Sequence, residues 1–319
     1  MNKRLRIFLL CVGALFLLLL PLASPALISS YYLDLVTKVL IFGIALLGYD
    51  ILAGYTGLVS LGHALFFGLG GYCTAFVATQ YTANLLPILL FALVVTWIVG
   101  IIVGYFSTQT KDIFFVFLTL AFAQFFYLAA FNLTTITGGD NGITVPKITL
   151  GIPHVWEAAI PRPFHFYYLV VVIFLASYAI CRKVIRSPFG QVLVAIRENE
   201  ERVSFLGFNV RRLKIKSYMI SISLTAVAGV LFAAYQDFVS PGMIHWTISG
   251  DFILMSVLGG MGTLIGPVLG GAIVILLGDW LSSITENWMI FIGSFFVLMI
   301  IFAPNGIMGF FTRNGRYGT

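Results

Sequence analysis

The sequence predicts an all-α polytopic membrane protein with about ten transmembrane segments and both termini in the cytoplasm. Hydrophobic residues make up 60% of its 319 residues, charged residues make up 9%, and the mean hydropathy is +1.03. A soluble domain carries about 25% charged residues, so a chain this apolar needs lipid as its solvent. The basic residues are also unevenly spread, because half of the 18 lysines and arginines lie between Arg182 and Lys216.

The predicted crossings are apolar runs close to the ~20 residues that a bilayer requires. The first run, 7–22, follows Lys3, Arg4 and Arg6. A secretory signal peptide has the same outline, but Pro25 and the lack of a clean cleavage site favour an uncleaved helix. The other predicted crossings are 32–53, 58–79, 84–107, 113–133, 164–183, 216–236, 249–262, 264–281 and 286–303.

Charge placement sets the orientation and the number of crossings. Lysines and arginines concentrate on the cytoplasmic side of membrane proteins, so the basic residues near both termini, including Arg313 and Arg316, place both ends inside. The number of crossings must then be even. Glycine costs about 1 kcal/mol and proline about 3 kcal/mol inside a helix, which favours a split near residue 262 and gives ten. Whether 249–281 crosses once or twice is the open point.

One transmembrane domain, 1–319, accounts for the whole chain. Its polar segment 134–163 is expected outside the cell, and its basic segment 184–215 is expected in the cytoplasm. The basic residues cluster at predicted inner membrane edges, so they do not indicate nucleic-acid binding. The three cysteines, all in apolar runs, fit buried small side chains better than disulfides or metal ligands.

The sequence contains no set of residues typical of an enzyme. It lacks H-E-x-x-H, G-x-S-x-G and a Cys/His pair at metal spacing, and it lacks the P-loop pattern G-x-x-x-x-G-K-[ST]. We therefore expect a transport subunit that has no metal or cofactor of its own and takes its energy from elsewhere.

Two glycine-rich interruptions lie at comparable places in the two halves of the chain. The first is 54–63, which includes Ser60 and His63, and the second is 258–267. Paired broken helices indicate an internal repeat with a translocation path between its halves, because lipid cannot satisfy free backbone groups. The predicted path residues are Gly54, Gly57, Ser60, Gly62, His63, Gly259 and Gly262. The alternative is that these glycines only allow helices to pack closely.

Two residues near the first interruption have simpler interpretations as well. His63 fits a hydrogen-bonded packing residue better than a ligand or proton carrier. Asp50 lies within one turn of Gly54, near the predicted inner end of its helix, where cytoplasmic water could solvate its carboxylate.

The cytoplasmic segment predicts one amphipathic helix of about five turns. Ser187 is a suitable N-cap, Pro188 fits the first helical position, and Gly207 is a natural stop. Leu193, Ile196, Val203 and Leu206 fall near one face, and Glu198–Arg202 and Arg197–Glu201 are spaced to pair. Such a helix could lie on the membrane, but the acidic residues Glu198, Glu200 and Glu201 would be repelled by anionic lipid, which favours docking to a protein.

Four motifs occur in the order of a known family. They are GYTGLVSLGHALFFGLGGY from residue 54, TGGDNGI from 137, SPFGQVLVAIRENEERVSFLGFNV from 187 and LGGMGTLIGPVLGG from 258. Together they resemble the permeases of bacterial branched-chain amino-acid ABC transporters, the LivM type. Asp50 departs from this pattern, because the family commonly carries asparagine there, and the polarity of the inner gate is then in doubt.

The resemblance implies a subunit of an importer in the bacterial inner membrane. Its partners would be a homologous second permease of the LivH type, two cytoplasmic ATPases that bind the ATP, and an extracytoplasmic binding protein. The implied ATPase-docking residues are Ala195, Arg197, Glu198, Asn199, Glu200 and Gly207, and the residues expected to face the binding protein are Gly138, Gly139 and Asn141. Relatives carry leucine, isoleucine and valine, or other amino acids, urea or aromatic acids.

The main alternative is an ion-coupled secondary transporter of small solutes. That class needs ionisable groups near the membrane midplane. The acidic residues of the apolar runs are expected at helix ends instead, which counts against it: Asp34, Asp237, Asp251, Asp279 and Glu286.

Overall fold

The computed structural model describes residues 30–110, 112–152, 156–160, 163–303 and 305–311. The predicted first crossing, Cys11 and both charged termini lie outside these residues. The helices are α2 (Ser30–Asp50), η2 (Ile51–Tyr55), α3 (His63–Gln80), α4 (Leu85–Ser107), α5 (Asp112–Asn132), α6 (Thr134–Thr137), η3 (Gly139–Asn141), α7 (Phe164–Arg186), α8 (Pro188–Glu198), α9 (Glu200–Phe205), α10 (Val210–Gln236), η4 (Pro241–Met243), α11 (Trp246–Gly259), α12 (Ile265–Ser282), α13 (Trp288–Phe302) and α14 (Gly306–Phe311). The strands are β1 (Ile143–Thr144), β2 (Thr149–Ile152), β3 (Trp156–Ala159) and β4 (Phe238–Val239).

The described chain is a helical bundle, as predicted, and every predicted crossing after the first coincides with a helix. Within the described residues, seven helices are long and apolar enough to cross a membrane: Ser30–Tyr55, Leu85–Ser107, Ile113–Asn132, Phe164–Arg186, Val210–Gln236, Ile265–Ser282 and Trp288–Gly309. The segments α3 and α11 are not among them, and α11 has only 14 residues, fewer than a crossing needs. The total of ten crossings therefore stays a prediction.

The centre of the bundle is formed by α2 and α10, which pack against each other. Around them, α3 packs against α10, and α7 and α12 pack against α2. From Leu40 to Asp50 every residue of α2 is buried. Small residues bring α3 and α10 together, since a Cβ on Gly229 would overlap the Phe67 carbonyl and one on Gly70 would overlap the Ala226 carbonyl. This is the close packing that membrane helices achieve through glycine.

Large apolar side chains cover the outside of the bundle. Trp97 and Ile98 on α4, Phe114 on α5, and Ile301 and Phe302 on α13 are all exposed. In water such a surface would aggregate, whereas lipid tails accept it. Cys73 and Cys181 are buried thiols, as the sequence predicted for them.

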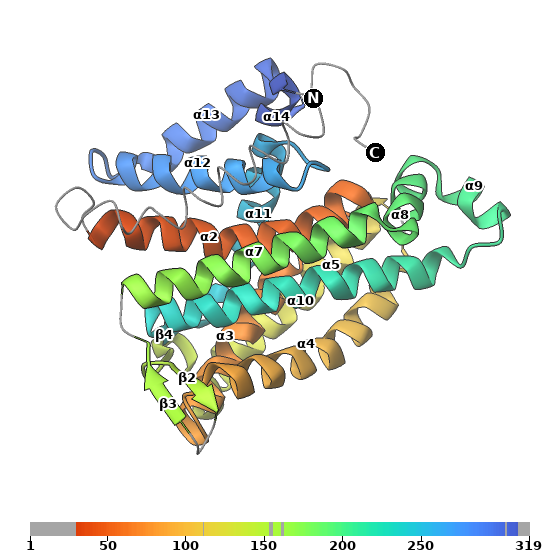
Figure 1. Ribbon diagram of the computed structural model, residues 1–319. Coiled ribbons are helices and arrows are strands. Elements are labelled where there is room, and N and C mark those ends of the chain that lie inside the picture. The colour runs from red at the N-terminus through yellow and green to blue at the C-terminus, as the bar shows by residue number, and fades with distance from the viewer. Residues whose placement is uncertain (1–29, 111, 153–155, 161–162, 304, 312–319) are drawn as a thin grey trace.

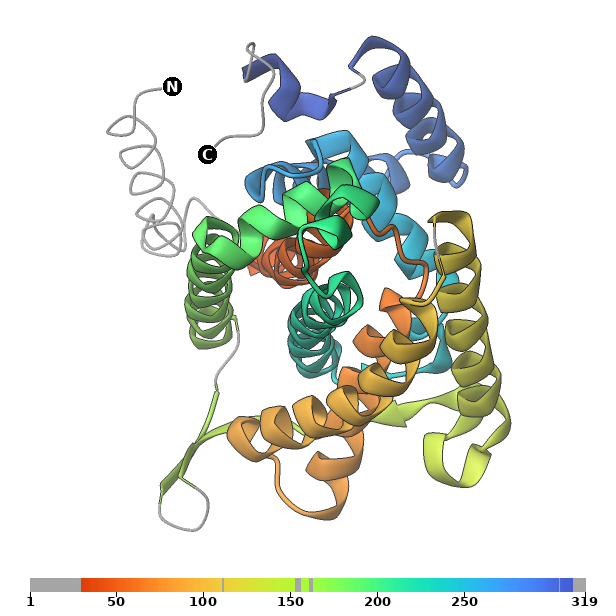
Figure 2. The same cartoon turned by 90° about the vertical axis from the view of Figure 1, so that its right-hand side faces the viewer.

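The two polar segments lie at opposite ends of the bundle (Figure 1). At one end, β2 and β3 form an antiparallel hairpin, and β1 pairs antiparallel with β4. Asn84 fastens the hairpin to α4, because its Nδ2 donates to the Gly151 carbonyl at 2.9 Å while its Oδ1 caps the helix. The opposite end carries α8 and α9, and Figure 2 shows α8 lying across that end of the bundle. The positions of the two polar segments at opposite ends agree with the prediction that one is extracytoplasmic and the other is cytoplasmic.

Candidate functional site

The first interruption begins where α2 changes to the π-helical turn η2. The chain then leaves helical geometry until α3 starts at His63, and Gly57 takes a positive φ of 81°. Single π-helical turns are rare and often mark functional positions. The freed backbone is paired inside the protein, since the Leu58 amide donates to the Leu52 carbonyl at 3.0 Å and the Leu61 amide to Thr119 Oγ1 at 3.2 Å.

The second interruption separates α11 from α12. Gly260 and Gly262 have φ angles of 105° and 81°, and Leu264 has a φ of 62°, which is uncommon for a residue with a side chain. Gly259 has another role, because a Cβ there would overlap the Gly266 carbonyl. Gly262 therefore shapes the break, whereas Gly259 lets α11 and α12 pack closely, and a path-lining role for either glycine stays a prediction.

Asp50 joins the two interruptions, which lie more than 200 residues apart in the sequence. Its Oδ1 accepts a hydrogen bond from the Gly262 amide at 2.7 Å, and its Oδ2 accepts one from the Leu264 amide at 2.9 Å. The residue is 0% exposed. The expectation of a carboxylate solvated from the cytoplasm is therefore wrong, because backbone amides of the second interruption take the place of water.

Gly54 makes the close contact with Asp50 possible. A Cβ on Gly54 would overlap Asp50 Oδ1 and stand 2.5 Å from the Gly262 nitrogen. Real Cβ atoms do not approach other atoms so closely. Glycine at this position thus provides the space in which the two interruptions meet.

His63 lies at the start of α3 and contacts α10. Its Nε2 lies 2.7 Å from Ser221 Oγ, and its ring packs edge-on against Tyr49. Nearby, Thr56 Oγ1 lies 2.6 Å from Ser217 Oγ. Sequence reasoning missed both serines, although two hydroxyls four residues apart on an apolar helix are a visible signal.

The predicted path residues gather around the first interruption but differ in their surroundings. Gly54, Ser60, Gly62 and His63 are buried among the described helices, and Gly57 is exposed. The Ser60 hydroxyl accepts from the Gly62 amide at 3.1 Å. His63 has the hydrogen-bonded packing that the sequence favoured, and a path-lining role for this group remains a prediction.

The segment predicted to be cytoplasmic folds as two helices, α8 and α9, rather than as the one helix of five turns that we expected. Ser187 does cap α8, since its hydroxyl accepts from the Gly190 amide, and Pro188 is its first residue. Asn199 then adopts an extended conformation and caps α9, its Oδ1 accepting from the Arg202 amide at 2.8 Å. A side-chain cap followed by acidic residues in the first turn starts a new helix, and this ends the first.

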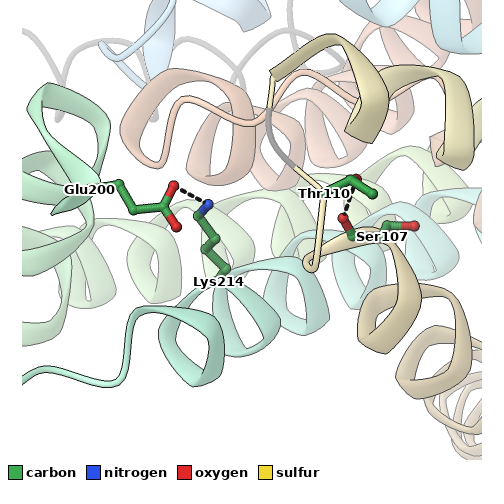
Figure 3. A network of polar contacts seen from close by, with 4 residues as sticks. All are labelled: Ser107, Thr110, Glu200 and Lys214. Carbon is green, nitrogen blue, oxygen red and sulfur yellow. Dashed lines mark hydrogen bonds and ion pairs between the residues drawn. The ribbon is translucent and has the colours of Figure 1, made fainter. Parts of the chain in front are cut away.

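The inner face of this segment is attached to the bundle. Leu193, Ile196 and Val203 are buried, as predicted. The Arg197 guanidinium donates to the Gly54 carbonyl at the first interruption. Lys214 of α10, only 3% exposed, forms an ion pair with Glu200 of α9 (Figure 3).

The outer face of the segment carries an unexpected apolar tip. Phe205, Leu206 and Phe208 are 87%, 72% and 46% exposed. The prediction that Leu206 shares one face with the buried Leu193, Ile196 and Val203 is therefore wrong. The cause is the end of α9 at Phe205, after which Gly207 turns the chain with a φ of 86°. The predicted stop at Gly207 is confirmed.

The predicted outer loop is a tight turn held by the antiparallel pairing of β1 with β4. Gly138, Gly139 and Gly142 all have positive φ angles, and a Cβ on Gly142 would overlap the Val239 carbonyl. Asn141 ends the short helix η3 just before this point. The turn is thus fixed against the loop that follows α10, and its contact with a binding protein stays a prediction.

The acidic residues of the apolar runs are largely at helix ends. Asp237 caps the end of α10 and Asp279 lies in the last turn of α12. Asp34 and Asp251 lie one turn further in, in the second turns of α2 and α11.

Known proteins with similar sequences are transport permeases. The profile of a family described as a permease component of branched-chain amino acid transport systems matches residues 31–303. The high-affinity branched-chain amino acid permease LivM of Escherichia coli K12 is 29% identical over 311 residues, which cover 92% of this chain and 73% of that protein. The probable LivM of Methanocaldococcus jannaschii is 26% identical, covering 86% and 94%, and LivH of Escherichia coli K12 is 26% identical, covering 56% and 59%. No solved structure matches.

Proposed function

We propose that this chain, which belongs to the family of permease components of branched-chain amino acid transport systems, is the LivM-type subunit of an ABC importer for these amino acids. The observation that carries the proposal is the two-sided cytoplasmic segment α8–α9. Its inner side is attached to a break in the bundle through Arg197, and its outer side presents the apolar tip of Phe205, Leu206 and Phe208. A rigid element with one face in the bundle and one face free can carry force from a cytoplasmic partner.

The family suggests the partners of the proposed importer. A homologous LivH-type permease pairs with this chain in the bacterial inner membrane, and two cytoplasmic ATPases bind and hydrolyse the ATP. One ATPase holds the apolar tip together with the predicted docking residues, which are Ala195, Arg197, Glu198, Asn199, Glu200 and Gly207. Of these, Arg197 and Glu200 also bind the bundle, through Gly54 and Lys214. An extracytoplasmic binding protein delivers the amino acid at the opposite end, near Gly138, Gly139 and Asn141.

The proposed transport step is a change between two states of the permease pair. Closure of the ATPases displaces α8 and α9, and this displacement biases the bundle toward one of its two arrangements. The substrate enters between the two permeases and passes the interrupted helices. The binding protein performs most of the selection among branched-chain amino acids.

Reconstitution tests this proposal against ion-coupled transport. We expect leucine uptake into proteoliposomes only when both permeases, the ATPases, the binding protein and ATP are present, and we expect vanadate to abolish it. Dissipating the ion gradients should leave the initial rate unchanged. Uptake that collapses with the ion gradient and continues without ATPases would establish the secondary transporter instead.

A further inference from the structure

We propose that Asp50 is a positioning residue that ties the two helix interruptions into one unit, which the cytoplasmic segment moves through Arg197. The inference deepens the proposed function and rests on it. It adds a defined mechanical link between the ATPase-facing segment and the second half of the chain, a link in which three elements meet at Gly54.

Two hydrogen bonds join Asp50 to the second interruption. The carboxylate accepts one hydrogen bond at each oxygen, from the Gly262 and Leu264 amides at 2.7 and 2.9 Å. These donors belong to a stretch with three positive φ angles, one of them at Leu264. Glycine adopts such angles freely, but at Leu264 this conformation is strained and persists only when its surroundings hold it. The hydrogen bonds from these two amides to Asp50 keep the stretch in this conformation.

The two amide donors suit a carboxylate at position 50 better than a neutral side chain. Two N–H groups converge on Asp50, one at each oxygen. An ionised carboxylate accepts at both oxygens and carries no hydrogen that would face either donor. Hydrogen bonds to an ionised group are about twice as strong as neutral ones. An asparagine would accept one bond and would turn its own N–H₂ toward the other amide. The site is therefore built for an acid.

Arg197 of α8 connects this junction to the cytoplasmic segment. The Arg197 guanidinium donates to the Gly54 carbonyl, and the Arg197 side chain also packs against Gly57, where a Cβ would stand 2.9 Å from its Cγ. Gly54 lies one helical turn after Asp50 and touches the Gly262 amide. A displacement of α8 therefore acts on the backbone that carries Asp50, and Asp50 passes it to the break between α11 and α12.

A purely structural staple would also explain the two hydrogen bonds, and it makes a different prediction. A staple affects how much transporter assembles and how stable it is. A transmitting link affects how much substrate moves for each ATP hydrolysed by transporter that has assembled. The ratio of transport to ATP hydrolysis, measured per assembled complex, separates the two.

The experiment uses the complete importer in proteoliposomes with Asp50→Ala, Asp50→Asn and the control Glu286→Gln. Glu286 is an exposed acid between α12 and α13 and lies outside the link. We expect Asp50→Ala to lower the leucine transported per ATP by about tenfold or more, the effect expected from loss of a charged hydrogen bond, with the ATPases still co-purifying. Asp50→Asn should give an intermediate ratio, and the control should match the wild type.

A second arm tests the direction of the link. Arg197→Ala should lower the same ratio, and the Asp50→Ala/Arg197→Ala double variant should fall little further, because both changes cut one connection. A wild-type ratio in whichever Asp50 variant assembles overturns the inference, as does full additivity in the double variant. If the wild-type complex shows no ATP-dependent uptake at all, the proposed function fails and not this link.

Discussion

Replacing Gly54 with alanine should break the junction between the two helix interruptions. The new Cβ would overlap Asp50 Oδ1 and stand 2.5 Å from the Gly262 nitrogen, so the backbone or the carboxylate has to move. Overpacking a tight site costs about 1–3 kcal/mol, and losing one of the Asp50 hydrogen bonds adds about 1.5–3 kcal/mol. The total, about 2.5–6 kcal/mol, is large beside the 5–15 kcal/mol that typically stabilise a folded protein.

The assay is thermal unfolding of the purified complex in detergent, followed by intrinsic fluorescence, together with leucine uptake. Gly54→Ala should lower the unfolding midpoint by several degrees and abolish most of the uptake. The matched control is Gly250→Ala, because a Cβ there meets nothing within 4 Å and alanine favours the helix by about 1 kcal/mol. The Asp50→Ala/Gly54→Ala variant should lose less stability than the sum of its two changes. A wild-type midpoint for Gly54→Ala would show that the contact between Asp50 and the second interruption does not depend on the space at Gly54.

Three further changes test other parts of the structure. Ser221→Ala removes the partner of His63 Nε2 in a buried site, so the unfolding midpoint should fall by the equivalent of about 1–3 kcal/mol, and an unchanged midpoint would show that the contact is dispensable. Gly207→Ala meets open space, so its cost is backbone strain of about 1–2 kcal/mol, and it should reduce ATPase co-purification while leaving the bundle's midpoint near that of the wild type. Gly142→Ala forces the outer turn away from Val239, so stimulation of ATP hydrolysis by the binding protein should fall while basal hydrolysis persists; normal stimulation would leave this loop as a plain turn.

Local signals in the sequence predicted local structure well. The cap at Ser187, the proline after it and the stop at Gly207 all act within a few residues, and the structure has each of them where the sequence indicated. The break at Asn199 could have been predicted by the same logic, since an N-cap residue precedes Glu200 and Glu201. The continuous spacing of apolar residues across this point concealed it.

The junction at Asp50 could not be predicted from patterns of this kind. Its hydrogen bonds join residues 212 and 214 positions apart, and no periodicity reports which loops meet in space. The sequence indicated two glycine-rich interruptions, but it did not indicate that one glycine, Gly54, is there to admit the contact between them. For the same reason the outward turn of Leu206 was missed, because the direction of a side chain after a helix ends depends on the turn that ends it.

The proposed docking of the α9 tip to a cytoplasmic ATPase is tested most directly by the accessibility of this tip in the assembled transporter. Phe205→Cys in an otherwise cysteine-free chain would be labelled with a membrane-impermeant thiol reagent in right-side-out and inverted vesicles. If the α9 tip docks to an ATPase in the cytoplasm, we expect labelling in inverted vesicles only. We also expect this cysteine to be protected when the ATPases are bound. Labelling from the outer face, or equal labelling with and without the ATPases, would contradict it.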